Sequence, residues 1–298
     1  MVPVSRMPET LAKIVEHKRA EVARAKARTP VSELEAMVAQ EEQPRNFFRA
    51  VTRASQTGGV PGVTVIAEVK RKSPSAGWIR PEYDGDRFAP EEIATKYHSA
   101  GAAAISCLTD EHFFAGHLSY IHRIKESVPL PVLRKDFIID PWQLWQSRAF
   151  GADAVLLIAE CLEQSLMIDL LILAQQLQLT TLLEVHSAEN LLRVRPYVGF
   201  PHPSYALLGI NNRDLGTMRV DLGHTIRLVE LVENRATLVS ESGIHHPEDL
   251  ERLRRVGVRI VLVGEHLMRQ EDPGNGLRVL LGSQGDYSGG SYVESKPG

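Results

Sequence analysis

Four charged residues lie within aliphatic segments of the sequence, where charge is costly. Glu68 and Lys70 end the segment VTVIAEVK, two residues apart and therefore on one face of a strand. Lys135 lies within PVLRKDFII, and Glu184 lies within TTLLEVH. A charge inside an apolar strand destabilises the fold unless it is paired or used. Two ammonium groups and two carboxylates facing one cavity favour acid–base catalysis over a purely structural salt-bridge network.

The segments that carry these charges belong to a repeating pattern. Eight short aliphatic or β-branched runs begin near residues 63, 102, 131, 152, 180, 205, 237 and 259, about 28 residues apart on average. This interval fits a strand, a helix and two short loops. The runs are continuous rather than alternating, which is typical of parallel strands covered on both faces.

Amphipathic segments separate the runs, and we expect helices at PEEIATKYHSAGA, HLSYIHRIKESV, PWQLWQSRAFGA, LEQSLMIDLLILAQQLQL, SAENLLRVRPYV and HPEDLERLRRVG. Gly101, Gly151 and Gly257 end three of them and can adopt the left-handed conformation that stops a helix. Eight such units predict the α/β class and a (β/α)8 TIM barrel. A doubly wound sheet is the alternative, but no strand leads into a GxGxxG turn.

Three parts of the chain are expected. Residues 1–60 form an N-terminal helical extension packed on the barrel, with helices at 8–28 and at PRNFFRAV. Residues 61–282 form the barrel. Residues 283–298 are rich in Gly and Ser, which predicts a flexible tail.

The catalytic face of such a barrel lies at the carboxyl ends of its strands, and polar residues gather there in this sequence. Asn211 and Arg213 follow the sixth run, and Glu241 and Ser242 end the seventh. The loops after the seventh and eighth strands are the usual phosphate site of this fold. Gly243 and Gly264 would let backbone amides approach an anion there, while Lys70 and Ser73 add charge and a hydroxyl.

Composition restricts the class of partner. The 298 residues have 43% hydrophobic and 24% charged residues and a formal net charge of -3, so neither nucleic acid nor a membrane surface is an expected partner. Cys107 and Cys161 lie in apolar runs and are expected to be buried thiols. The first residues lack the apolar segment of a signal peptide, so we expect a cytoplasmic protein. The oligomeric state stays open, with a monomer as one option.

Six motifs occur in order along the chain: IAEVKRKSPSAG, LRKDFIID, LLEVHS, GINNRDL, VSESGI and VGEHLMR. Together they resemble the motifs of indole-3-glycerol-phosphate synthases, from the segment LAKIVEHKRAEV to about Leu280. The resemblance implies that 1-(2-carboxyphenylamino)-1-deoxyribulose 5-phosphate is cyclised, decarboxylated and dehydrated to indole-3-glycerol phosphate in tryptophan biosynthesis. It implies no cofactor and no metal.

This chemistry suggests a role for each candidate catalytic residue. Lys135 is the general acid that protonates the sugar ketone, because burial and the nearby charge of Lys70 should lower the pKa of its ammonium group. Glu184 is the base of the dehydration, with Lys70 facing it across the substrate. Glu68 holds the lysines and stabilises positive charge on the anilino nitrogen, and Asn211 orients the leaving hydroxyl.

The substrate-binding residues follow in the same way. Arg213 is expected to hold the aromatic carboxylate until CO2 departs, and Glu241 is assigned to the substrate pocket. Phosphate is assigned to Ser73, Ser242, Gly243 and the amides of Gly264 and Glu265.

The sequence departs from the family pattern at one position of the phosphate loop. His266 stands in GEHLM, where many relatives have serine. The segment AGWIRPEYDGDRF is predicted to be a mobile lid, with Gly77 and Gly85 as hinges and Trp78 as a reporter of closure. His112, His117, His245 and His246 are interpreted as solvated or helix-capping residues, because their spacing does not make a metal site.

Two other functions remain open at this stage. One is another phosphosugar barrel, such as an Amadori-type isomerase or an epimerase, which would release no CO2. The other is a catalytically silent barrel that binds an anion or a partner protein. Two lysines and two glutamates exceed the single acid–base pair that an isomerase needs, and a silent barrel would leave them without a purpose.

Overall fold

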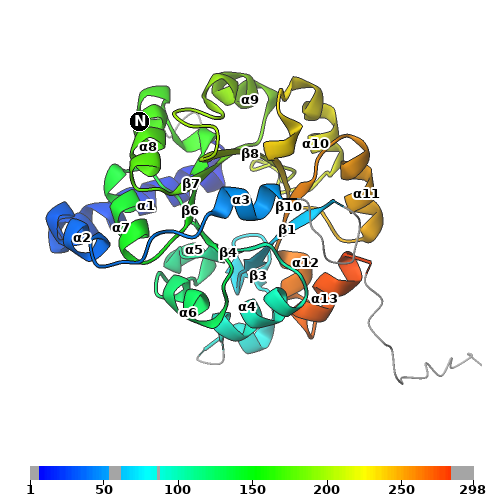
Figure 1. Ribbon diagram of the computed structural model, residues 1–298, viewed down its shortest axis with the longest axis horizontal. Coiled ribbons are helices and arrows are strands. Elements are labelled where there is room, and N and C mark those ends of the chain that lie inside the picture. Colours follow the sequence, from blue (N-terminus) through cyan, green and yellow to red (C-terminus); the bar gives the residue numbers. More distant parts are fainter. Residues whose placement is uncertain (1–6, 54–61, 86–87, 283–298) are drawn as a thin grey trace, which may run out of the picture.

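The computed structural model describes residues 7–53, 62–85 and 88–282 (Figure 1). Eight parallel strands close into a barrel in the order β1-β10-β9-β8-β7-β6-β5-β4, with helices around it. The predicted (β/α)8 barrel is therefore confirmed. The barrel strands are β1 (Thr64–Val69), β4 (Ala104–Leu108), β5 (Val132–Lys135), β6 (Ala154–Ile158), β7 (Thr180–Val185), β8 (Ala206–Asn211), β9 (Leu238–Glu241) and β10 (Ile260–Val263).

The helices lie mostly where the amphipathic segments predict them. All six predicted connecting helices are present, as are both predicted helices of the extension. The extension comprises α1 (Glu9–Arg28), α2 (Val31–Val38) and α3 (Phe47–Thr52). Around the barrel lie α4 (Pro90–Ser99), α5 (Glu111–Phe114), α6 (Tyr120–Ser127), α7 (Pro141–Ala149), α8 (Gln164–Gln176), α9 (Ala188–Val194), α10 (Gly223–Leu228), α11 (Pro247–Arg255), α12 (Glu265–Met268) and α13 (Pro273–Leu280). Single 3-10 turns are η2 (Pro81–Tyr83), η3 (Ala159–Cys161), η4 (Arg195–Tyr197), η5 (Val229–Leu231) and η6 (Arg235–Thr237).

The continuous apolar runs become strands buried on both faces. Every residue of β1, β7 and β8 is buried, as expected for parallel strands enclosed by helices. Gly101, Gly151 and Gly257 have φ angles of 94°, 78° and 86°, so each takes the predicted left-handed conformation after its helix. Both cysteines are free and buried, as predicted. No helix in the described part of the chain is long and apolar enough to cross a membrane.

A buried ion-pair network joins α1 to the strand that carries Lys135. Lys18 is only 1% exposed, and its ammonium group lies 2.9 Å from Asp110 and 3.0 Å from Asp136. Asp136 also pairs with Arg134 at 2.9 Å. Burial raises the pKa of the Asp136 carboxyl. Lys18 and Arg134 together lower it by a larger amount, so the net pKa lies far below its usual value. The extension is thus fixed to Asp136, the residue that follows Lys135.

The loop after β1 carries a small hairpin and the predicted lid. Its strands, β2 (Lys72–Ser73) and β3 (Gly77–Trp78), pair antiparallel. Arg71 donates to the backbone oxygens of Tyr83 and Gly85 at 2.8 and 2.9 Å, and the Tyr83 hydroxyl donates to Met268 O. These bonds hold the described part of the lid against the barrel, while residues 86–87 lie outside the described residues. The motion of the lid stays a prediction.

The boundaries of the three expected parts also stay predictions. Leu11, Val15, Phe47 and Val51 of the extension belong to the same hydrophobic core as the barrel strands, which agrees with an extension packed on the barrel. The tail at 283–298 and residues 1–6 and 54–61 lie outside the described residues.

We predict that Lys18→Met lowers the free energy of unfolding by about 3–5 kcal/mol, because it leaves buried carboxylates without their cation. Lys26→Met is the matched control. Lys26 lies on the same helix and pairs with Asp140 at 2.8 Å, but its side chain is 44% exposed, so its loss should cost less than about 1 kcal/mol. Urea unfolding measures both variants. Equal losses in the two variants would contradict the prediction.

Candidate active site

A cavity of about 590 Å³ lies at the carboxyl ends of the barrel strands. Its volume is typical of small-molecule sites. Thr10, Leu11 and Ile14 of α1 close one side of it. The structure brings every sequence-predicted site residue to this cavity: Glu68, Lys70, Ser73, Lys135, Glu184, Asn211, Arg213, Glu241, Ser242, Gly243, Gly264 and Glu265.

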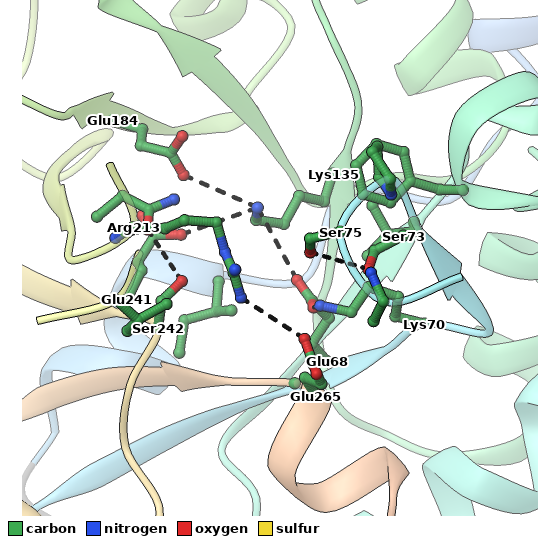
Figure 2. A pocket seen from close by; sticks show the side chains of 18 of the residues that line it. Glu68, Lys70, Ser73, Ser75, Lys135, Glu184, Arg213, Glu241, Ser242 and Glu265 are labelled. Atoms are coloured by element: carbon green, nitrogen blue, oxygen red, sulfur yellow. Dashed lines mark hydrogen bonds and ion pairs between the residues drawn. The ribbon is translucent and has the colours of Figure 1, made fainter. Parts of the chain in front are cut away.

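The Lys135 ammonium group lies at the centre of this cavity, among three carboxylates (Figure 2). It is 3.8 Å from Glu184 and 3.9 Å from Glu68. A third carboxylate, that of Glu241, is 4.0 Å away. The four side chains come from four different strands, so the closure of the barrel creates the cluster.

The environment of Lys135 corrects the expectation that its pKa is lowered. Burial lowers the pKa of the Lys135 ammonium group. The charges of Glu184, Glu68 and Glu241 together raise it by a larger amount, so the net pKa lies above its usual value. Lys70 does not supply the expected repulsion, because its own ammonium group lies 2.7 Å from Glu68. Lys135 is therefore a stable cation at neutral pH.

Glu68 links the two lysines. Burial raises the pKa of its carboxyl, but Lys70 and Lys135 together lower this pKa by a larger amount, so Glu68 is ionised. Its carboxylate lies against Gly264, where a Cβ atom would overlap Glu68 Oε1. The predicted bridging position of Glu68 is present, and the glycine gives it space.

Glu184 and Glu241 have opposite protonation tendencies. Burial raises the pKa of the Glu184 carboxyl, but Lys135 and His186 together lower this pKa by a larger amount, which keeps Glu184 ionised. Burial and the nearby charge of Glu184 raise the pKa of the Glu241 carboxyl well above its usual value. Within the described residues, neither oxygen of Glu241 has a hydrogen-bond partner. Of these two carboxyls, Glu241 is therefore the one whose protonated form is favoured.

The strand ends of β8 and β9 meet through Asn211. Its Oδ1 accepts hydrogen bonds from the Ser242 hydroxyl at 2.9 Å and from the Arg213 amide at 3.0 Å. Ser242 and Gly243 have φ angles of 68° and 77°, so two successive residues take the left-handed conformation at the end of β9. For a serine this conformation is uncommon and typical of functional sites. The Arg213 guanidinium lies 3.5 Å from Glu265.

Comparison with known proteins gives the family. The model of the family "Indole-3-glycerol phosphate synthase" matches residues 11–280. Indole-3-glycerol phosphate synthase of Rhodospirillum rubrum is 41% identical over 276 residues, which are 93% of this chain and 100% of the relative. That of Rhodopirellula baltica is 44% identical over 262 residues, 88% of this chain and 95% of the relative. The chain belongs to the indole-3-glycerol phosphate synthase family.

Solved structures agree on the fold of this synthase-family chain. A crystal structure of 3-hexulose-6-phosphate synthase has a TM-score of 0.56 and 14% identity, covering 74% of this chain and 99% of that one. The Salmonella typhimurium 3-hexulose-6-phosphate synthase has a TM-score of 0.55 at 14% identity, covering 74% of this chain and 100% of that one. These identities support the barrel fold alone.

His186 lines the cavity but was not among the predicted site residues. His186 is 3.4 Å from Glu184, and its Nδ1 lies 3.2 Å from Glu160. Burial lowers the pKa of the His186 ring, but Glu160 and Glu184 together raise this pKa by a larger amount, so the net pKa lies above its usual value. His186 follows Glu184 by two residues, and this strand periodicity was a usable signal. No sequence signal predicted that Glu160 approaches it from the end of β6.

Two histidines also line the cavity rim. His245 was interpreted as a solvated or helix-capping residue and is exposed, and His266 was noted only as a departure from the family pattern. His112 and His117 are exposed and His246 precedes α11, as interpreted from the sequence. Among the described residues, no group of three or more His, Cys, Asp or Glu side chains is arranged to hold a metal ion.

We predict that Glu241 gives a protonated-carboxyl C=O band in the infrared spectrum at pH 7, because burial and Glu184 disfavour its charge. Glu241→Gln should remove this band. Glu265→Gln is the control and should leave it unchanged, because Glu265 pairs with Arg213 and Arg269 and has a lowered pKa. A parent protein without the band, or a Glu241→Gln variant that retains it, would show that Glu241 is ionised.

Proposed function

We propose that the protein catalyses the synthase reaction itself, converting 1-(2-carboxyphenylamino)-1-deoxyribulose 5-phosphate into indole-3-glycerol phosphate, CO2 and water. The observation that carries the proposal is the Lys135 ammonium group between three carboxylates, with Lys70 as a second cation on Glu68. A dehydrating ring closure needs at least one donor and one acceptor on opposite sides of the substrate, and this cluster supplies both kinds of group. Family membership supports the substrate.

In the first step, the aromatic carbon that bears the carboxylate attacks the sugar ketone. A C–C bond forms, the carbonyl π electrons move to oxygen, and Lys135 donates a proton to that oxygen. The anilino nitrogen becomes positively charged, and the carboxylate of Glu68 stabilises this charge. Because the pKa of Lys135 is raised, it holds its proton until the ketone oxygen becomes basic in the transition state.

In the second step, the C–CO2 bond breaks and its electron pair restores the aromatic ring and neutralises the nitrogen. Arg213 is assigned to the substrate carboxylate before this loss, with Glu265 as its partner in the free protein at 3.5 Å. Leu156, Ile158 and Leu262 also line the cavity, and apolar surroundings favour the departure of a charged group as neutral CO2.

In the third step, water leaves. Glu184 removes a proton from the methylene carbon next to the nitrogen, Lys70 delivers a proton to the hydroxyl, and the C–O bond breaks as the ring double bond forms. Asn211 orients the hydroxyl group, and its amide is held by Ser242. Ionised Glu184 suits the role of base, whereas protonated Glu241 suits a hydrogen-bond donor in the substrate pocket.

The phosphate group is assigned to the rim formed by Ser73, Ser242, Gly243, Gly264 and the amide of Glu265. Ser242 and Gly243 both have positive φ angles and line the cavity, and successive backbone N–H groups in such a turn can bind an anion. The Ser73 hydroxyl accepts from the Ala76 amide and lies 3.4 Å from Ser75, so the first loop places a second hydroxyl beside it.

The proposal places the protein among carboxy-lyases of tryptophan biosynthesis, in the cytoplasm. Its chemistry is proton transfer and decarboxylation driven by restored aromaticity, for which the described side chains suffice without a cofactor or metal. The partner is a phosphorylated small molecule.

We expect the parent protein to produce indole fluorescence and CO2 from the carboxyphenylamino-deoxyribulose phosphate. An Amadori-type isomerase or epimerase would release no CO2, and a silent barrel would show no change in ultraviolet absorbance. A folded parent protein that forms no indole would overturn the proposed function.

We predict that Lys135→Met and Glu184→Gln each lower kcat at least about a hundredfold, the scale of a lost acid or base. Glu241→Gln should stay within about tenfold of the parent, because an amide resembles the protonated carboxyl in shape and in donating a hydrogen bond. Single-turnover fluorescence measures all three variants, and circular dichroism checks their folding. A Glu241→Gln variant as slow as Glu184→Gln would show that Glu241 acts as a base.

A further inference from the structure

Two histidine rings face each other on the rim of the cavity. His245 lies beyond β9 and His266 lies in α12, and both line the cavity. Their Nδ1 atoms are 3.4 Å apart, and their rings meet edge to face with centroids 5.2 Å apart. His246 is the next ring, with centroids 6.3 and 6.5 Å from those of His245 and His266, but it is not among the lining residues.

The charges around this pair leave it without an anionic partner of its own. From α11, Asp249 accepts the backbone N–H groups of His245 and His246 at 3.1 Å each. From α12, Glu265 pairs with Arg269 at 2.8 Å and with Arg213 at 3.5 Å. Both carboxylates already bind other groups, and Asp249 also acts on the charge of His266.

The protonated form of the His266 ring is therefore disfavoured in the free protein. Burial, His245 and His246 lower the pKa of His266, and Asp249 opposes this only in part. At 3.4 Å, two facing Nδ1 atoms can share one proton, but two imidazolium rings would repel each other. An added anion would change this balance.

We propose that the His245–His266 pair is a proton-accepting part of the phosphate subsite, which takes up a proton when a phosphate monoester dianion binds. The inference rests on the proposed function for the position of the phosphate, since the same rim includes Ser242, Gly243 and Gly264. It adds that affinity for the phosphate group depends on pH through these two rings.

The direction of the pH dependence follows from linkage. The dianion stabilises the imidazolium form by charge-assisted hydrogen bonding, so the pKa of the pair is higher in the complex than in the free protein. Affinity is therefore greatest below the pKa of the free pair and falls as pH rises toward the pKa of the complex. The fall cannot exceed about tenfold per pH unit, because one proton is exchanged.

The test uses sn-glycerol 3-phosphate as the probe, because the second ionisation of a phosphate monoester lies near pH ~6 and the ligand is a dianion above pH ~7. Isothermal titration calorimetry at pH 7.5, in two buffers of different ionisation enthalpy, gives the number of protons taken up. We expect net uptake by the parent, and an affinity about five- to tenfold weaker at pH 8.5 than at pH 7.

Three variants locate the proton. His266→Ser and His245→Ser should each bind the probe without proton uptake and with little dependence on pH. His246→Ser is the matched control, because serine can still cap α11 and residue 246 does not line the cavity, so this variant should still take up a proton when it binds the probe. Uptake that survives in His266→Ser, uptake lost in His246→Ser, or a parent that takes up no proton or binds no probe would each overturn the inference.

The turnover assay separates this inference from the proposed function. A parent that forms indole but binds the probe without proton uptake overturns the histidine proposal alone. A parent that binds the probe with proton uptake through the pair but forms no indole overturns the proposed reaction and supports a phosphate site controlled by the two histidines.

Discussion

A single buried ammonium group at the mouth of the barrel determines how the rest of the site can be charged. Lys135 lies within 4.0 Å of three carboxylates, and only one of them, Glu68, has a second lysine. Lys70 and Lys135 alone do not balance three carboxylates, which favours the protonated form of one of them. Glu241 is that group because burial and the neighbouring Glu184 disfavour its charge, whereas His186 supports the charge of Glu184. The division of the site into an ionised base and a neutral donor follows from this imbalance.

The N-terminal extension matters to the site because it fixes the strand that carries Lys135. Side chains alternate along β5, so Lys135 points into the barrel while its neighbours Arg134 and Asp136 point to the surrounding layer. There Asp136 accepts from Thr109 and pairs with Lys18 of α1. The strand end that must hold Lys135 is thereby fixed from outside by a helix that also contributes Leu11 and Ile14 to the cavity wall. The contacts of Asp136 with Lys18 and Thr109 therefore stabilise the fold and also position Lys135.

The sequence predicted the features that depend on local pattern. Strands followed from continuous apolar runs, helix ends from glycines such as Gly101, and the cavity residues from charges at strand ends. The raised pKa of Lys135 could not be predicted, because it depends on distances to carboxylates on three other strands. The approach of Glu160 to His186 has the same origin. Helix α2 escaped prediction because its eight residues are too few to show a clear period beside the longer α1.

The crowding of carboxylates also accounts for two glycines, one of which, Gly264, was assigned to phosphate from the sequence. Gly264 was expected to let backbone amides approach an anion, yet a Cβ there would overlap Glu68 Oε1. Gly209 stands in the same relation to Glu241 Oε1 across the barrel. Each glycine leaves space beside a buried carboxylate that must keep its distance to Lys135. A side chain at either position would move a carboxylate and change the balance of charge, so these glycines shape the electrostatics of the site as well as its backbone.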